Sequence, residues 1–190
     1  MSSSSTATAA SSVIDFLTLV TKLKRTKRTG WVNNQISQPE SISDHMHRMS
    51  IMALLLDDSS IDKTRCVKLA IVHDLAECLV GDITPYDGVG KEDKHQMEKQ
   101  AMAELVETLG QDNNQGGREI YELWNEYEDN RTNEAQVVHQ LDKCEMIQQA
   151  MEYEKSDNKR LDQFFDTTRH LFTHPQIKSW ADEIQNRRKK

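Results

Sequence analysis

The sequence predicts an all-α fold built as a single domain. From residue 13 onward apolar residues recur with a helical period, and the alternating β-branched runs typical of strands are missing. The three prolines, Pro39, Pro85 and Pro175, each lie near a predicted helix boundary, as expected of a residue that disrupts helix interiors. A chain of 190 residues is long enough for one substantial core.

Eight helices are predicted along the chain. The first places Ile14, Leu17 and Val20 on one side, and the later segments show similar apolar spacing. The predicted ranges are 13–23, 41–56, 62–80, 91–109, 118–128, 133–154, 160–172 and 175–187. Residues 1–12 are rich in Ser, Thr and Ala and are predicted to be a disordered tail, which leaves residues 13–190 as the folded domain.

Composition argues against several classes of function. The formal charge of −7 and the pI near 5.5 disfavour a general nucleic-acid-binding surface. No apolar run approaches the roughly 20 residues that a membrane span needs, and residues 1–12 lack the basic start and apolar middle of a secretory signal. The three cysteines show no CxxC spacing, which indicates reduced thiols. We expect a cytoplasmic protein, with an organelle as the alternative, that binds neither nucleic acid nor membranes.

One apolar segment, AIVHDLAECLVGDI at 70–83, carries four ionisable side chains. On a regular helix with His73 at zero, Asp74 lies at about 100° and Glu77 at about 40°, while apolar residues fill most of the remaining circle. Asp82 follows just past the helix end. An isolated buried carboxylate is costly unless it is paired or bound to a metal. This arc therefore favours a metal site over the alternative of one buried His–carboxylate pair.

A metal ion needs further ligands from other helices. His45 shares a helical stripe with Met49 and Met52, so it faces whatever that stripe packs against, but a single histidine there also suits an ordinary core. Asp142 lies beside Leu141 on a mostly amphipathic helix, where an aspartate is normally solvated. Spacing alone therefore leaves both positions open.

The order of these residues resembles that of the HD-domain metal phosphohydrolases. A single histidine, an adjacent His-Asp pair on a later helix and a distant aspartate follow one another along the chain. The sequence is most similar to the 5′-deoxynucleotidase branch, the HD domain-containing protein 2 family, over nearly all of residues 13–190. The similar segments are RTGWV (28–32), ESISDHMHRM (40–49), HDLAECLVGDI (73–83), LWNEYE (123–128), EAQVV (134–138) and LDKCEMIQQAMEYE (141–154).

The resemblance implies an HD-domain helical bundle and a set of metal ligands. The four ligands of a first divalent ion would be His45, His73, Asp74 and Asp142. The oxygen ligands of a second site, near the substrate phosphate, would be Glu77, Asp82 and the carbonyl of Ile83. A direct role of Glu77 as proton donor or water-orienting group is the alternative. Two imidazoles and two carboxylates suit Mn²⁺, Co²⁺, Fe²⁺ or Zn²⁺, and an oxygen-rich second site suits Mg²⁺ or Mn²⁺.

The resemblance also implies a reaction, the hydrolysis of deoxyribonucleoside 5′-monophosphates to a deoxynucleoside and phosphate. The metal would lower the pKa of a bound water for in-line attack on phosphorus, and Glu77 or Asp82 would arrange the proton for the O5′ leaving group. One alternative is another HD-type nucleotide phosphohydrolase, such as a phosphodiesterase, a nucleoside triphosphohydrolase or a stringent-response nucleotide hydrolase. The other is a non-catalytic, metal-stabilised nucleotide-binding or scaffold protein, for which Glu77 and Asp82 would be unnecessary.

Substrate selection is expected just before the first histidine. In the related deoxynucleotidases an Arg-Trp pair there lines the sugar and phosphate. Trp31 matches the tryptophan, but Gly30 precedes it and the nearest arginine is Arg28. We expect Arg28 and Trp31 to bind the substrate, with a core-covering aromatic as the alternative for Trp31. The resemblance further implies a homodimer.

Overall fold

The computed structural model describes residues 3–110 and 114–189, and in these residues it consists of helices, turns and connecting segments. Their one strand-like feature is an isolated antiparallel bridge between Lys27 and Ser41. The all-α prediction is confirmed. The chain divides into two compact units, unit 1 (Met1–Asp44 and Val72–Asn125) and unit 2 (His45–Ile71 and Glu126–Lys190). Among the described helices, none is long and apolar enough to cross a membrane.

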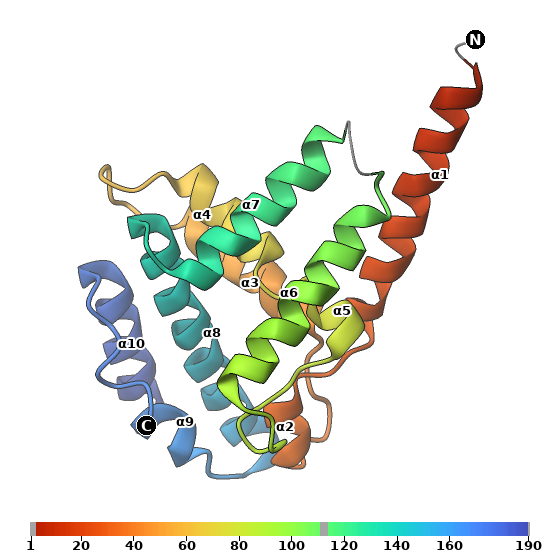
Figure 1. The fold of residues 1–190 in the computed structure, drawn as a ribbon. Coiled ribbons are helices and arrows are strands. Elements are labelled where there is room, and N and C mark those ends of the chain that lie inside the picture. Colours follow the sequence, from red (N-terminus) through yellow and green to blue (C-terminus); the bar gives the residue numbers. More distant parts are fainter. Residues whose placement is uncertain (1–2, 111–113, 190) are drawn as a thin grey trace. The chain divides into compact units, whose positions relative to one another are not determined.

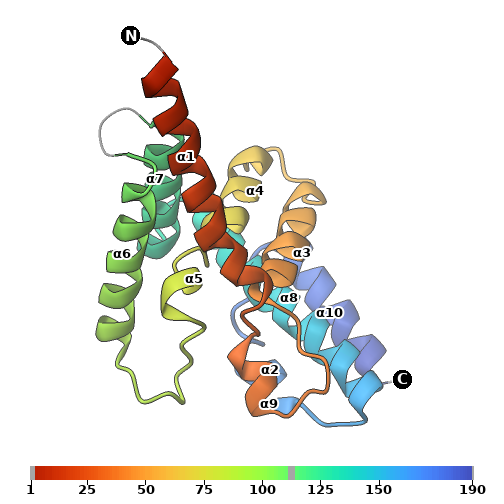
Figure 2. The same ribbon diagram turned by 90° about the vertical axis from the view of Figure 1, so that its right-hand side faces the viewer.

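The helices can be followed by label in Figures 1 and 2. Those within unit 1 are α1 (Ser3–Val20), the 3₁₀ helix η1 (Thr21–Lys24), α2 (Thr29–Asn33), α5 (Glu77–Val80) and α6 (Lys91–Glu107). Those within unit 2 are α8 (Asn133–Asp157), α9 (Asp162–Asp166) and α10 (Pro175–Arg188). The boundaries between the units fall within α3 (Ile42–Leu54), α4 (Lys63–Val72) and α7 (Gln115–Asp129).

In unit 1, the short helix α5 packs against three other helices. α5 contacts η1, α1 and α6, and α6 lies beside α7 in both views (Figures 1 and 2). The ring of Trp124 on α7 stacks on His95 of α6, with 6.1 Å between the ring centroids. Met102 and Leu105 of α6 are fully buried. The start of α5, which carries Glu77, is thus held by helices of its own unit.

Helix α1 begins at Ser3, whereas the sequence predicts a disordered tail up to residue 12. Residues 1–2 of that tail lie outside the described residues. The extension is consistent with the several alanines in this stretch, because alanine has the highest intrinsic helix propensity. Ile14 and Leu17 are exposed, and Phe16 is buried.

The single helix predicted over residues 62–80 is wrong. α4 ends at Val72, a turn covers residues 73–76, and α5 follows. Backbone hydrogen bonds in this stretch join residues three apart, as from Leu75 N to the Val72 carbonyl and from Glu77 N to the Asp74 carbonyl, both 3.1 Å. Such bonding winds the chain at about three residues per turn. The 100° step of a regular helix therefore does not describe the positions of His73, Asp74 and Glu77.

Two other elements differ from the sequence prediction. α2 has five residues, too few for an apolar period to reveal it. The predicted helix 160–172 is reduced to α9, which is followed by turns. The Thr167 and Thr168 hydroxyls donate there to the carbonyls of Gln163 and Phe164, and such side-chain bonds compete with helix continuation.

Unit 2 is built around α8, which contacts both α9 and α10. Arg188 of α10 donates to Glu154 of α8 at 2.6 Å, and its guanidinium carbon lies 3.9 Å from the centroid of the Phe165 ring on α9. Before α10 begins, the Gln140 side-chain oxygen accepts the N–H groups of Thr173 and His174. α8, which carries Asp142, is thus tied at several points along its length.

Candidate metal centre

In unit 1, the predicted ligands His73 and Asp74 lie in the turn between α4 and α5. The His73 ring is buried, and its Nε2 lies 3.1 Å from Asp74 Oδ2. Two ligand atoms that each lie about 2.1 Å from one ion are themselves separated by roughly 3 Å. The pair has the spacing of two ligands of a single metal ion.

The next acidic residue, Asp82, is held by the start of α2. Gly81 ends α5 with φ +77°, a conformation that strains any residue with a side chain. The chain then continues to Asp82, whose Oδ2 accepts the Thr29 backbone N–H at 2.6 Å. The Thr29 hydroxyl donates to the Asp82 carbonyl at 2.7 Å. Ile83 follows and is half-buried.

Arg28, immediately before α2, lies between two carboxylates. Its Nη1 is 3.7 Å from Asp74 Oδ2, and its Nε is 3.8 Å from Glu40 Oε1. The same Glu40 oxygen accepts the indole N–H of Trp31 at 2.9 Å. Trp31 is only 1% exposed, so its ring belongs to the core of the structure. Arg28, by contrast, is next to the His-Asp pair, and its contact with Asp74 was not evident from the sequence.

Glu77 occupies an acidic environment. It is 5% exposed, and its Oε2 has no hydrogen-bond partner in the part of the chain that the structure describes. Burial, followed by the charges of Asp74 and Asp82, raises the pKa of Glu77 well above its ordinary value, while Arg28 and Lys94 act in the opposite direction. The carboxyl group is thus suited to keeping a proton or to facing a cation.

In unit 2, the predicted ligands His45 and Asp142 lie together. His45 Nε2 is 3.3 Å from Asp142 Oδ1, close to the spacing expected of two ligands of one ion. Asp142 is buried rather than solvated, and its Oδ2 accepts a hydrogen bond from Lys143 at 2.8 Å.

The other nitrogen of His45 contacts a residue that the sequence prediction missed. His45 Nδ1 lies 2.6 Å from Glu145 Oε2, and both side chains are 0% exposed. Arg48 Nε donates to the second Glu145 oxygen at 2.7 Å. A signal was present: Glu145 is three residues after Asp142, and Arg48 three after His45, so each pair shares a helix face.

The nitrogen and oxygen atoms of these residues fit a divalent transition metal. Thiolate ligands are disfavoured, because burial raises the pKa of Cys144 to about 12 and that of Cys78 to about 11. Among the described residues, no cysteine belongs to a group of side chains that could hold a metal ion, so a structural zinc site built from cysteines finds no support there.

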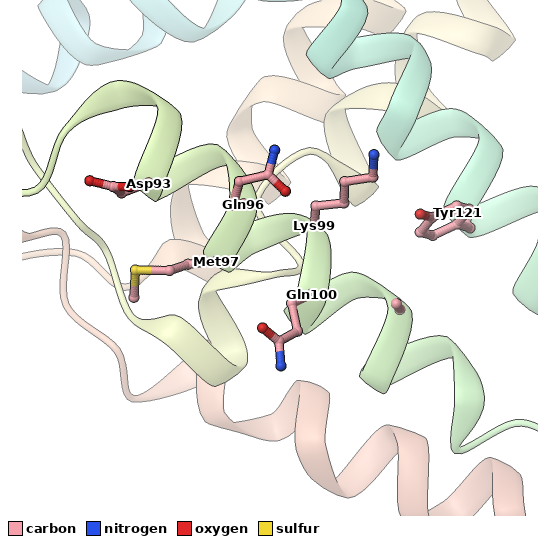
Figure 3. A pocket seen from close by; sticks show the side chains of 7 residues that line it. Asp93, Gln96, Met97, Lys99, Gln100 and Tyr121 are labelled. Carbon is pink, nitrogen blue, oxygen red and sulfur yellow. The ribbon is translucent and has the colours of Figure 1, made fainter.

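Unit 1 also has a shallow hollow of about 470 Å³ along α6 (Figure 3). Its lining residues are Asp93, Gln96, Met97, Lys99, Gln100, Ala103 and Tyr121. None of these is a predicted site residue, and the labelled side chains extend from separate positions on α6 and α7 (Figure 3). The hollow is distinct from the group around His73 and Asp74.

Comparison with known proteins finds relatives over nearly the whole chain. The chain is 50% identical over 181 residues to 5′-deoxynucleotidase HDDC2 of Bos taurus, covering 94% of this chain and 87% of the bovine protein. It is 46% identical over 180 residues to 5′-deoxynucleotidase hdd1 of Schizosaccharomyces pombe, covering 93% and 90% of the two chains.

Solved structures show the same fold. The PH0347 protein of Pyrococcus horikoshii OT3 matches with a TM-score of 0.72 and 33% identity, over 92% of this chain and 97% of that protein. The HD domain-containing protein YGK1 matches with a TM-score of 0.69 and 28% identity, over 94% and 86% of the two chains. The family model described as HD domain matches residues 20–184. By its sequence and its fold, the chain belongs to the HD-domain family.

Proposed function

We propose that this protein is a metal-dependent 5′-deoxynucleotidase, which hydrolyses deoxyribonucleoside 5′-monophosphates to a deoxynucleoside and phosphate. The names of the relatives and their identity over nearly the whole chain support this activity. The observation that carries the proposal is the His73–Asp74 pair, with the buried acid Glu77 at the next helix start and Arg28 beside Asp74. These are the groups that a metal-assisted phosphate hydrolysis needs.

The proposed ligands of one divalent ion are the four that the family resemblance implies, His45, His73, Asp74 and Asp142. Each of the two histidine–aspartate pairs has a nitrogen and an oxygen at ligand spacing, and the order of the four residues along the chain resembles that of the family. Mn²⁺, Co²⁺, Fe²⁺ and Zn²⁺ suit such a set. A bound ion would lower the pKa of a coordinated water and polarise the phosphoryl oxygens.

The proposed proton donor to the O5′ leaving group is Glu77. Its raised pKa favours a protonated carboxyl group, and general acids typically contribute about 10²- to 10⁴-fold to a rate. Asp82 is less suited to this role, because its Oδ2 already accepts the Thr29 N–H. As an alternative, Glu77, Asp82 and the Ile83 carbonyl would hold a second ion, for which Mg²⁺ or Mn²⁺ is suitable.

Arg28 is the proposed phosphate-binding residue, since its guanidinium lies next to Asp74. Trp31 is proposed to act in sugar selection. Because its ring is buried and its N–H is bound by Glu40, it would do so by setting the position of Glu40 and Arg28. We further propose a homodimer in the cytoplasm, as the family resemblance and the reduced cysteines suggest.

The test is phosphate release from paired deoxy- and ribonucleoside 5′-monophosphates, with a nucleoside triphosphate and a cyclic nucleotide alongside. We expect release mainly from the deoxyribonucleoside monophosphates, lost with a chelator and restored by Mn²⁺ or Co²⁺. Conversion of the cyclic nucleotide to a monophosphate, or of the triphosphate to a nucleoside and tripolyphosphate, releases no phosphate and is followed by chromatography of the nucleotides. Either conversion without hydrolysis of the monophosphates would favour another HD-type hydrolase. Metal binding without conversion of any of these nucleotides would indicate a binding protein.

A further inference from the structure

The contact between His45 and Glu145 has a defined direction of hydrogen bonding. An ionised carboxylate can only accept hydrogen bonds, so the hydrogen in the 2.6 Å contact belongs to His45 Nδ1. In a neutral ring the lone pair is then on Nε2, the atom that lies 3.3 Å from Asp142 Oδ1. Both side chains are fully buried, where neither could exchange its partner for water.

Glu145 is held in turn by Arg48. The Arg48 Nε donates to Glu145 Oε1 at 2.7 Å, its Nη1 donates to Glu152 at 2.9 Å, and its Nη2 donates to Gln149. Burial opposes the charge of Arg48, but Glu145 and Glu152 raise its pKa above the ordinary value. The guanidinium therefore stays charged and fixes both the position and the charge of the Glu145 carboxylate.

We propose that Glu145 is a positioning residue for the metal ion, orienting His45 so that Nε2 serves as the ligand, and that Arg48 secures it. The inference rests on the proposed function only in taking His45 as a ligand. A carboxylate on the far nitrogen fixes the tautomer and ring orientation and raises the basicity of the ligand nitrogen, and loss of such a partner typically lowers metal affinity about 10- to 100-fold.

The test is the Mn²⁺ affinity of the full-length protein, measured by competition with a chelator. Glu145→Gln keeps the shape and can still accept the Nδ1 hydrogen, but it removes the charge, so we expect affinity to fall about 10-fold. Glu145→Ala removes the acceptor as well, and we expect a fall of about 100-fold.

Glu152→Gln is the matched control. It lies on the same helix and also contacts Arg48, but it has no contact with His45 among the described contacts. We expect its Mn²⁺ affinity to stay within about threefold of the parent, below the range for partners of a ligand histidine. Thermal melting in excess chelator, which reports the fold without metal, checks that each variant is folded.

The outcomes separate this inference from the proposed function. A parent protein that binds no Mn²⁺, Co²⁺, Fe²⁺ or Zn²⁺ would contradict both. If the parent binds Mn²⁺ and a folded Glu145→Gln variant binds it with equal affinity, the role of Glu145 alone is overturned. The same holds if Glu152→Gln loses as much Mn²⁺ affinity as Glu145→Gln. If neither Glu145 variant folds, Arg48→Gln decides: it releases Glu145 and should also weaken Mn²⁺ binding, and parental affinity there would overturn the inference.

Discussion

Replacing Glu77 tests the proposed chemistry in two independent ways. Glu77→Ala removes the proposed proton donor but none of the four proposed ligands of the first ion. We expect turnover to fall about 10²- to 10⁴-fold, the usual contribution of a general acid, while bound Mn²⁺ stays near the parental amount. Phosphate release and metal analysis on the same preparation give both quantities. Turnover within a few-fold of the parent would refute this role of Glu77.

Stability supplies the second measurement. Burial beside Asp74 and Asp82 holds the pKa of Glu77 well above its ordinary value of 4.5 in the folded protein. At a pH between the ordinary pKa and the folded-state pKa, the unfolded chain has released the Glu77 proton that the folded chain retains. The free energy of unfolding therefore falls as the pH rises, until the folded-state pKa is passed.

Glu77→Gln removes this loss, since an amide does not titrate. Each tenfold difference in the Glu77 acid constant between the folded and unfolded states is worth about 1.4 kcal/mol. For a chain of this size each kcal/mol moves Tm by about 2–4 °C. In excess chelator, Glu77→Gln should therefore gain in Tm over the parent as the pH rises. Parallel Tm curves for the two proteins would show that folding does not raise the pKa of Glu77.

Three further changes follow from the described contacts. Asp74→Asn should abolish activity and reduce bound metal, and metal analysis that shows full occupancy would contradict its role as a ligand. The variant should also lose the increase in Tm that added metal gives the parent. Trp31→Phe leaves the largely buried Glu40 side chain without the indole N–H, at a cost of about 1–3 kcal/mol, and should narrow the ratio of deoxy- to ribonucleotide turnover. A lower Tm with an unchanged ratio would limit Trp31 to the core. Arg188→Met leaves the nearly buried Glu154 without its ion pair, which should cost about 3 kcal/mol and lower Tm by roughly 6–12 °C, with turnover at low temperature unchanged.

The helical class and most of the long helices could be predicted from the sequence, because apolar period and proline placement report burial directly. The region around His73 and Asp74 could not. Its residues are almost all apolar or small, as in a continuous helix. The change to backbone hydrogen bonds between residues three apart therefore cannot be recognised from the apolar pattern of the sequence. In the structure, the charges of Asp74 and Asp82 add to the effect of burial in raising the pKa of Glu77, although the regular helix on which the prediction depends is interrupted.

Part of the candidate site could likewise be predicted from the sequence, and part of it could not. The resemblance implies His45 and Asp142 as ligands, and the structure brings His45 Nε2 to 3.3 Å from Asp142 Oδ1. Glu145 was missed because α8 carries many polar residues, and only contact with another helix distinguishes a buried glutamate from a solvated one. The resemblance predicts that Trp31 binds the substrate, but the ring is buried, and this burial depends on packing that its own short helix does not reveal.

The bridge between Lys27 and Ser41 has a consequence for how this protein can diverge. It pairs two residues on either side of a loop. The adjacent backbone hydrogen bond from Arg28 N to the Glu40 carbonyl, 3.2 Å, also holds the two ends of this loop together. Insertions between the exposed residues Ser37 and Gln38 would therefore leave the paired ends of the loop in place, and doubling the length of a flexible loop costs only about 0.6 kcal/mol. Arg28 and Glu40 would keep their places through such insertions. This loop is thus a position where natural variation or protein engineering can alter the surroundings of the site without rebuilding it.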